Sequence, residues 1–160
     1  MPASLSIRPE RPDQPGVVAL LDALDRYLAS LYPPEANHIM DVQELLAPEV
    51  SFLVARDGEL IVGTGACRRM PGEPQTGGEP YGEIKRMFVD PSRRGERLGA
   101  RLLAALEDTL RAEGFRLALL ETGREQSEAV RLYERCGYIE RGAYGGYPDN
   151  GLSVFYGKAL

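Results

Sequence analysis

The sequence predicts an α/β (α+β) fold, in which a central sheet is flanked by helices. Two observations carry this prediction. β-rich runs and amphipathic helical patterns follow one another in the order β-α-α-β-β-β-α-β-α-β-β, and 160 residues with 43% hydrophobic content are enough for one compact core. We therefore expect a single domain over residues 1–160.

The first elements are read from spacing and from turn residues. Residues 5–8 alternate weakly, which predicts a short strand. Residues 13–31 carry apolar side chains at helical spacing, with a proline near the start, where a missing N–H costs nothing; this predicts an amphipathic helix. Residues 42–46 are expected to form a second, short helix. Two β-rich runs flank Asp57-Gly58, a dipeptide that accepts the positive φ of a tight turn, so we expect a β-hairpin there.

The middle of the chain predicts a loop, a strand and the longest helix. Residues 71–80 contain three prolines and three glycines, a composition typical of a mobile loop. A strand follows at 82–89. From 96 to 113 leucines recur at intervals of three and four, and Gly114 supplies a left-handed stop.

The C-terminal part predicts a buried strand, a helix and two closing strands. The nearly continuous apolar run 115–121 is typical of a strand covered on both faces. Ser127 can cap the next helix, which Gly137 ends. The stretch 138–142 and the last nine residues supply the closing strands.

Charge is distributed unevenly along the chain. The formal net charge is −5 and the pI about 5.0, yet the seventeen positions from Lys85 to Arg101 hold six basic and two acidic residues and sum to +4. The remaining residues therefore sum to −9. One basic cluster is too little for a general nucleic-acid binder, which needs an extended basic surface. The cluster instead predicts a small anionic ligand.

Several classes of protein are disfavoured by what the sequence lacks. Cys67 and Cys136 have no Cys-x-x-Cys spacing, so we expect neither a disulfide framework nor a metal site. The first thirteen residues lack the apolar run of a secretory signal, and no apolar run approaches the ~20 residues of a membrane span. We expect a cytoplasmic protein without a membrane or nucleic-acid partner.

The turn between the strand at 82–89 and the following helix suits a diphosphate. The first amides of a helix have no intrahelical acceptor, and its dipole favours an anion at that end. Gly95 and Gly99 let a ligand approach the backbone, and Arg94, Arg97 and Arg101 can add charge-assisted bonds. A P-loop and a dinucleotide-binding motif are both missing. The alternative is that these arginines form an ordinary solvated helix face.

Two motifs resemble signatures of the GNAT superfamily of N-acetyltransferases. The segment 94–99, Arg-Gly-Glu-Arg-Leu-Gly, is similar to the Gln/Arg-x-x-Gly-x-Gly/Ala signature that cradles the coenzyme A pyrophosphate. The segment 129–138 is similar to the Ala-x-x-Leu-Tyr-x-x-x-Gly-Phe/Tyr signature. One departure is Arg97, which replaces the family's central glycine and could either crowd the pyrophosphate or turn outward and contact a phosphate.

The resemblance implies both the architecture and the cofactor site. It implies a mixed, mostly antiparallel sheet in which the strands at 82–89 and 115–121 splay apart and receive acetyl-CoA in the cleft between them. Main-chain groups of the first strand would bind the pantetheine arm as an added strand does. The implied cofactor-binding residues are Met87, Phe88, Val89, Arg94, Gly95, Glu96, Arg97, Leu98, Gly99, Ala100 and Gln126.

Two side chains are candidate catalytic groups. An attacking amine must lose a proton, and Glu83, directly or through water, is the first candidate base, with Glu121 the second. By two-residue alternation Glu83 shares a face with Lys85 and Met87. The alternative is that either glutamate only pairs with Lys85 or Arg86.

Tyr133 is the candidate acid, and the main chain supplies a candidate hydrogen-bond donor. The resemblance implies that the Tyr133 hydroxyl protonates the departing thiolate, although periodicity alone would make it a core tyrosine. A backbone N–H near Phe88 is the candidate donor to the thioester carbonyl, because a fixed donor aimed at a developing oxyanion lowers the barrier.

The acetyl acceptor is the least determined part. His38, the only histidine, is more typical of a surface or packing residue than of a catalytic one. Residues expected to line the acceptor pocket are Tyr32, Glu35, Asn37, His38, Tyr144, Tyr147 and Asp149. Their carboxylates and aromatic faces suit a cationic amine, and they would equally suit an exposed loop.

These observations support one main hypothesis with two alternatives. The chain is expected to be an acetyl-CoA-dependent N-acetyltransferase that acts on the primary amine of a small molecule, by direct attack in a ternary complex. A protein or peptide acceptor is the alternative within this class. A non-catalytic acyl-CoA sensor and a purely structural domain are the others, and the sequence is compatible with a homodimer.

Overall fold

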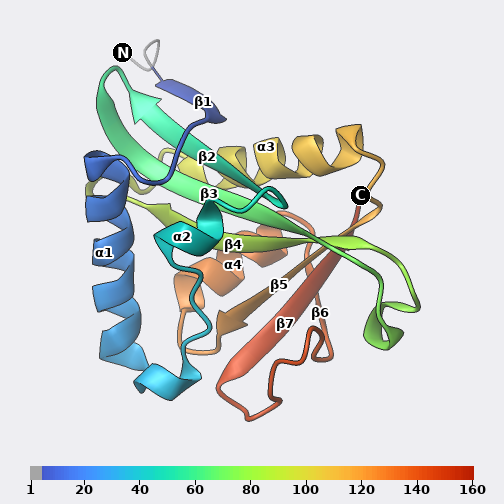
Figure 1. The fold of residues 1–160 in the computed structure, drawn as a ribbon. Coiled ribbons are helices and arrows are strands. Elements are labelled where there is room, and N and C mark those ends of the chain that lie inside the picture. The colour runs from blue at the N-terminus through green and yellow to red at the C-terminus, as the bar shows by residue number, and fades with distance from the viewer. Residues whose placement is uncertain (1–4) are drawn as a thin grey trace. The chain divides into compact units, whose positions relative to one another are not determined.

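The computed structural model describes residues 5–160 and confirms the predicted fold class. Within these residues the strands form one mixed, seven-stranded sheet in the order β1-β2-β3-β4-β5-β7-β6, flanked by helices (Figure 1). The chain divides into two compact units, one of residues up to 67 with 85–106 and one of residues 68–84 with 107–160. The single domain over residues 1–160 stays a prediction.

Every element predicted within residues 5–160 is found, with ends shifted by a few residues. The strands are β1 Leu5–Pro9, β2 Val50–Asp57, β3 Leu60–Met70, β4 Tyr81–Val89, β5 Leu117–Gly123, β6 Ile139–Arg141 and β7 Ser153–Ala159. The helices are α1 Pro15–Leu31, α2 Val42–Leu45, α3 Leu98–Ala112 and α4 Ser127–Arg135. The helix predicted from Glu96 thus begins at Leu98. The strand predicted from Phe115 begins at Leu117.

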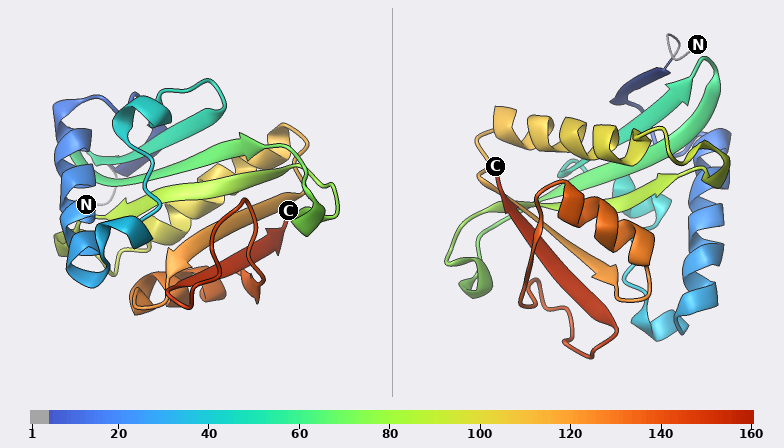
Figure 2. Two further views of the ribbon diagram at one scale, coloured as in Figure 1. Left: turned by 60° about the horizontal axis from the view of Figure 1, so that its bottom comes forward. Right: turned by 180° about the vertical axis from the view of Figure 1, so that it is seen from behind.

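The first unit buries apolar side chains on both faces of its strands. β1 pairs antiparallel with β2, from Leu5 opposite Asp57 to Pro9 opposite Leu53. On one face α1 and α2 cover the strands through a buried cluster of Val17, Leu21, Met40, Leu45, Phe52, Val54 and Ala66. The first half of α3 covers the other face, and the two views from opposite sides show α2 and α3 on opposite sides of β2 and β3 (Figures 1 and 2).

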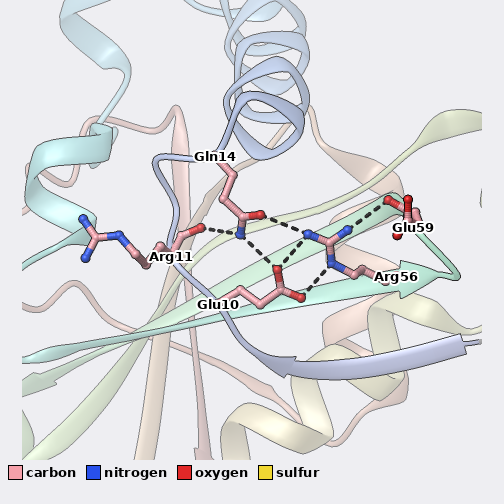
Figure 3. A network of polar contacts seen from close by, with 5 residues as sticks. All are labelled: Glu10, Arg11, Gln14, Arg56 and Glu59. Carbon is pink, nitrogen blue, oxygen red and sulfur yellow. Dashed lines mark hydrogen bonds and ion pairs between the residues drawn. The ribbon is translucent and has the colours of Figure 1, made fainter.

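A polar network fastens the start of α1 to the β2–β3 hairpin (Figure 3). Arg56 of β2 donates from Nε and Nη2 to the two carboxylate oxygens of Glu10 at 2.8 and 2.9 Å. Arg56 Nη2 also donates to Gln14 Oε1 at 3.0 Å, and Nη1 to the Glu59 carbonyl at 2.9 Å. This bidentate pair is half-buried, so it stabilises the fold more than an exposed ion pair would.

The second unit is built on β5, β7 and β6. β5 pairs antiparallel with β7 from Leu117 opposite Ala159 to Gly123 opposite Ser153, and β6 pairs with the other edge of β7. Helix α4 lies behind β5 and β7 in Figure 1 and in front of them in the right view of Figure 2, so it covers one face of these strands. A second cluster of Tyr81, Leu119, Tyr144 and Phe155 forms an aromatic core.

β4 and β5 run parallel. Their ladder joins Gly82 to Ala118 and Glu83 to Leu119, all four residues in the second unit. The parting of the two strands toward their C-terminal ends stays a prediction.

Two details of the loops and caps differ from the predictions. Gln126, not Ser127, occupies the N-cap position of α4, and its side chain makes no capping hydrogen bond. Ser127 is the first helical residue. The loop 71–80 contains a 3-10 turn at Pro74–Thr76, which Thr76 closes by hydrogen bonds to the backbone of Glu73. In residues 5–160, no helix combines the length and apolar character needed to cross a membrane.

Candidate active site

The turn after β4 is held by its own side chains. Asp90 Oδ1 accepts hydrogen bonds from the Ser92 N–H at 2.9 Å and from the Ser92 hydroxyl at 2.8 Å. These bonds lower the pKa of the Asp90 carboxyl below its usual value. Asp90 therefore fixes the entry to the 3-10 turn at Pro91–Arg93 as a charged acceptor.

Arg93 connects this turn to the β2–β3 hairpin. Its Nε donates to Glu96 Oε2 at 2.9 Å, and its Nη2 lies 2.9 Å from Asp57 Oδ2. The hydrogen bonds from Arg93 lower the pKa of Glu96. The Glu96 side chain is thus occupied by Arg93, so its predicted part in cofactor binding is restricted to the main chain.

Two left-handed residues shape the backbone where a diphosphate is expected. Gly95 has φ of +90° and Arg97 φ of +61°. A Cβ built on Gly95 would meet no atom within 4 Å, so open space borders this glycine. The first helical bond of α3 runs from the Arg101 N–H to the Arg97 carbonyl at 3.0 Å. The preceding amides of α3 have no acceptor within the helix, as a phosphate site requires.

The basic cluster separates into bound and exposed members. Arg86 and Arg93 are held by Asp25 and by Glu96 and Asp57, respectively. Arg97 and Arg101 are exposed and form no ion pair with another residue of 5–160, and the exposed Arg94 stacks over the Phe88 ring with Cζ 5.4 Å from its centroid. This turn therefore fits an anionic group such as the pyrophosphate of coenzyme A. Arg97 is turned toward solvent, one of the two orientations considered from the sequence.

Arg86 interrupts β4 just before Met87, Phe88 and Val89. It has φ of +55°, although it is not a glycine, and its carbonyl accepts a hydrogen bond from Thr64 Oγ1 at 2.9 Å. A left-handed non-glycine residue inside a strand is costly and occurs where the surroundings hold it. The buried Arg86 side chain reaches Asp25 of α1 at 2.7 Å.

The irregularity at Arg86 breaks the predicted alternation of side chains. Lys85 donates to the His38 carbonyl at 3.2 Å, so Lys85 and Arg86, although adjacent, both reach α1 or the segment after it. Met87 Sδ lies beside Gly65, close to Leu106 of α3. The prediction that Met87 shares a face with Lys85 is therefore wrong, because the left-handed residue shifts the two-residue period.

Glu83 is buried in the second unit and bound by two tyrosines. Its Oε2 accepts hydrogen bonds from the Tyr144 hydroxyl at 2.8 Å and from the Tyr147 hydroxyl at 2.6 Å. Burial and the neighbouring carboxylate raise the pKa of both tyrosines, so both keep their protons and act as donors. The hydrogen bonds described for Lys85 and Arg86 go to His38 and to Asp25 and Leu21, so neither cation is described as a partner of Glu83.

Tyr133 lies on the buried face of α4, as its helical position predicts. Its ring contacts that of Tyr138 edge to face at 6.0 Å. Burial raises the pKa of Tyr133 above its usual value, with smaller effects of Cys136 and Glu121. Its hydroxyl forms no hydrogen bond with another residue of 5–160. Gln126, the predicted cofactor contact, donates its N–H to the Gly123 carbonyl at the start of the same helix.

The residues expected to line an acceptor pocket differ in exposure. Tyr32 is buried, Asn37 and His38 are half-buried and Glu35 is exposed, all four in the first unit. In the second unit Tyr144 belongs to the core, Tyr147 is half-buried and Asp149 is exposed. Glu121, the second candidate base, accepts a hydrogen bond from the Ser153 hydroxyl at 2.7 Å. Because Tyr144 is buried, its predicted place in the lining of an acceptor pocket is not supported by its exposure.

Sequence reasoning missed the side chains that hold the site. Asp25 and Thr64 each bind Arg86, at separations of 61 and 22 positions, and Glu73 binds Tyr81 at a separation of 8. None of the three belongs to a motif. One local signal was Arg86, which stands just before the apolar run Met87, Phe88 and Val89. Among residues 5–160, no group of three or more His, Cys, Asp and Glu side chains is placed to hold a metal ion.

Comparison with known proteins gives the class of this fold and site. The model of the acetyltransferase (GNAT) family matches residues 17–138. An "IAA acetyltransferase" of Azospirillum brasilense is 45% identical over 98% of this chain and 99% of its own length. A mycothiol acetyltransferase of Sanguibacter keddieii is 39% identical over 55% of this chain and 28% of its own length.

Solved structures agree with these relatives. A Klebsiella pneumoniae protein described as an acyl-CoA N-acyltransferase is 34% identical, with a TM-score of 0.76 and 99% of both chains covered. The PaiA N-acetyltransferase of Thermoplasma acidophilum, solved with coenzyme A, has the same fold at 16% identity, with a TM-score of 0.76. The chain belongs to the GNAT family of acetyltransferases. It is an acyltransferase that uses acetyl-CoA as its acetyl donor.

Proposed function

We propose that this enzyme transfers the acetyl group of acetyl-CoA to the primary amine of a small molecule, by direct attack in a ternary complex. The observation that carries the proposal is Glu83, a buried carboxylate whose Oε2 is held by two tyrosine hydroxyls while Oε1 accepts no hydrogen bond from another residue of 5–160. A buried carboxylate with an uncommitted oxygen favours a polar or cationic partner.

The names of two relatives support a small-molecule acceptor. The proteins called IAA acetyltransferase and mycothiol acetyltransferase carry the names of small molecules. The match to the first spans 98% of this chain. A protein or peptide acceptor remains the alternative within the class.

The donor side of the proposal rests on the first unit. The amides of Leu98, Gly99 and Ala100, with Gly95 and the backbone of Glu96, would hold the pyrophosphate, and Arg94 and Arg97 would add charge. Met87, Phe88 and Val89 would bind the pantetheine arm through their main chain, with the N–H near Phe88 directed to the thioester carbonyl. Acetyl-CoA supplies an acetyl group activated as a thioester.

The acid and the base are assigned to the second unit. Glu83 would accept the proton of the ammonium group, directly or through water, so that the nitrogen keeps its lone pair for attack. The Tyr133 hydroxyl, which keeps its proton because burial raises its pKa, would protonate the departing thiolate. Gln126, at the start of the helix that carries Tyr133, would contact the cofactor.

A thiol-release assay with a panel of acceptors tests this function. The purified chain would be supplied with acetyl-CoA and, in separate reactions, an amino acid, a polyamine, an aromatic amine, and peptides with a free N-terminus or an internal lysine. We expect acceptor-dependent thiol release with at least one small amine, and an acetylated product of matching mass. Faster turnover of the peptides than of every small amine would contradict the assigned substrate class.

A further inference from the structure

The sequence Tyr144-Gly145-Gly146-Tyr147 forms a tight turn that brings two hydroxyls to one oxygen. The Tyr147 N–H donates to the Tyr144 carbonyl at 3.1 Å, and the two glycines have φ of +63° and +78°. Two consecutive left-handed residues require glycine or a close substitute. Both tyrosine hydroxyls at the ends of this turn donate to Glu83 Oε2.

Other groups of the second unit fix this turn in place. Glu73 Oε1 accepts hydrogen bonds from the Gly145 N–H at 2.8 Å and from the Tyr81 hydroxyl at 3.3 Å. The Tyr144 ring packs edge to face against Tyr81 at 5.5 Å and against Tyr147 at 5.4 Å. These ring contacts restrict the rotation of both tyrosine side chains. The two hydroxyls are therefore fixed within hydrogen-bonding distance of Glu83.

We propose that Tyr144 and Tyr147 are positioning residues for Glu83 in the acetyl transfer. They hold Oε2 and direct Oε1 toward the acceptor, so that Oε1 receives the proton when the ammonium N–H bond breaks. This inference rests on the proposed function, in which Glu83 is the base. It adds the residues that orient the base.

The physical reason is the cost of a buried charge. A carboxylate in a buried site is stabilised by donors, and two tyrosine hydroxyls on the same oxygen supply them without blocking the second oxygen. The charged and titratable groups that face Glu83 and its tyrosines are Tyr81, Glu73, Glu121 and Arg141. Arg141 stacks over the Tyr144 ring, with Cζ 5.9 Å from its centroid.

The test is the pH dependence of kcat/KM in Tyr147→Phe. The reaction would use acetyl-CoA and the small amine that the panel identifies as the fastest acceptor. Losing a donor favours the protonated carboxyl, so we expect the acidic limb of the profile to move to higher pH by about one unit, equivalent to roughly tenfold lower kcat/KM on that limb. Tyr144→Phe should move the limb in the same direction, which covers a Tyr147 variant that fails to fold.

Tyr156→Phe is the matched control. It removes a hydroxyl from another buried tyrosine of the second unit, and that hydroxyl donates to Glu134 and not to Glu83 or to the groups that fix the turn. A limb that moves equally in Tyr156→Phe and Tyr147→Phe, or in neither, would overturn the positioning role. Glu83→Gln separates this failure from that of the proposed function: if Glu83→Gln keeps wild-type turnover, Glu83 is not the base and both claims fall.

Discussion

Arg86 Nη1 donates to Asp25 Oδ1 at 2.7 Å and so joins α1 to the left-handed residue of β4. The Arg86 side chain is 5% exposed and that of Asp25 43%, so the cation is the buried partner. The residue that follows, Met87, begins the predicted binding segment for the pantetheine arm. The ion pair thus stabilises the backbone conformation that precedes this segment.

Removing the acidic partner should destabilise the protein. In Asp25→Ala the buried guanidinium loses its counter-charge, and we expect the free energy of unfolding to fall by about 1–3 kcal/mol, measured by urea denaturation. Asp22→Ala is the control, because Asp22 is exposed on the same helix. Equal losses in the two variants would show that Arg86 does not depend on Asp25.

Replacing Arg97 by glycine should stabilise the turn before α3. Its φ of +61° costs a residue with a Cβ roughly 1 kcal/mol relative to glycine, so the midpoint of urea unfolding should rise in Arg97→Gly. Arg101→Ala, an exposed substitution within α3, should change the unfolding free energy by less than about 0.5 kcal/mol. A lower midpoint in Arg97→Gly would mean that the guanidinium stabilises the fold more than the backbone strain costs.

Removing the Tyr133 hydroxyl should slow the reaction without weakening donor binding. If this hydroxyl protonates the thiolate, kcat in Tyr133→Phe falls by roughly 10²–10⁴-fold, while the Kd of acetyl-CoA from calorimetry stays within about twofold. Tyr27→Phe, at an exposed position of α1, should leave both quantities unchanged. A kcat equal to that of wild type would return Tyr133 to the role of a core tyrosine.

The pair of Glu10 and Arg56 should make stability depend on pH. Hydrogen bonding to Arg56 holds the pKa of Glu10 below its usual value of 4.5, so its stabilisation is present above that value and is lost as pH falls through the lowered pKa of the folded state. The difference in unfolding free energy between wild type and Glu10→Gln should therefore be largest near neutral pH. It should shrink below about pH 4.5, and a difference constant down to pH 3 would contradict this.

Much of the fold could be predicted because its signals are local. Leucines at helical spacing, the Asp57-Gly58 turn and the terminal Gly114 and Gly137 each act within a few residues, and all lie where they were expected; Gly58, Gly114 and Gly137 have positive φ. The turn at 94–99, which is predicted to bind a diphosphate, is likewise one contiguous segment, so a sequence motif can identify it. The start of α3 moved by two residues, from Glu96 to Leu98, because the left-handed φ of +61° at Arg97 is not helical.

Other features depended on contacts between distant residues. The partners of Glu83 lie 61 and 64 positions away, and Arg86 depends on Asp25 at the same separation of 61. No period or spacing rule joins such positions, so the sequence could not predict these partners. The cytoplasmic location and a homodimer stay predictions.

The sequence by itself determined the order of elements and the family, because these depend on local propensity and on contiguous motifs. The tertiary structure alone decided which side chains hold Arg86 in its left-handed conformation and which hydroxyls orient Glu83. Burial sets these choices: once a charged group leaves water, it is stabilised by whichever partners the fold brings to it, wherever they stand in the chain.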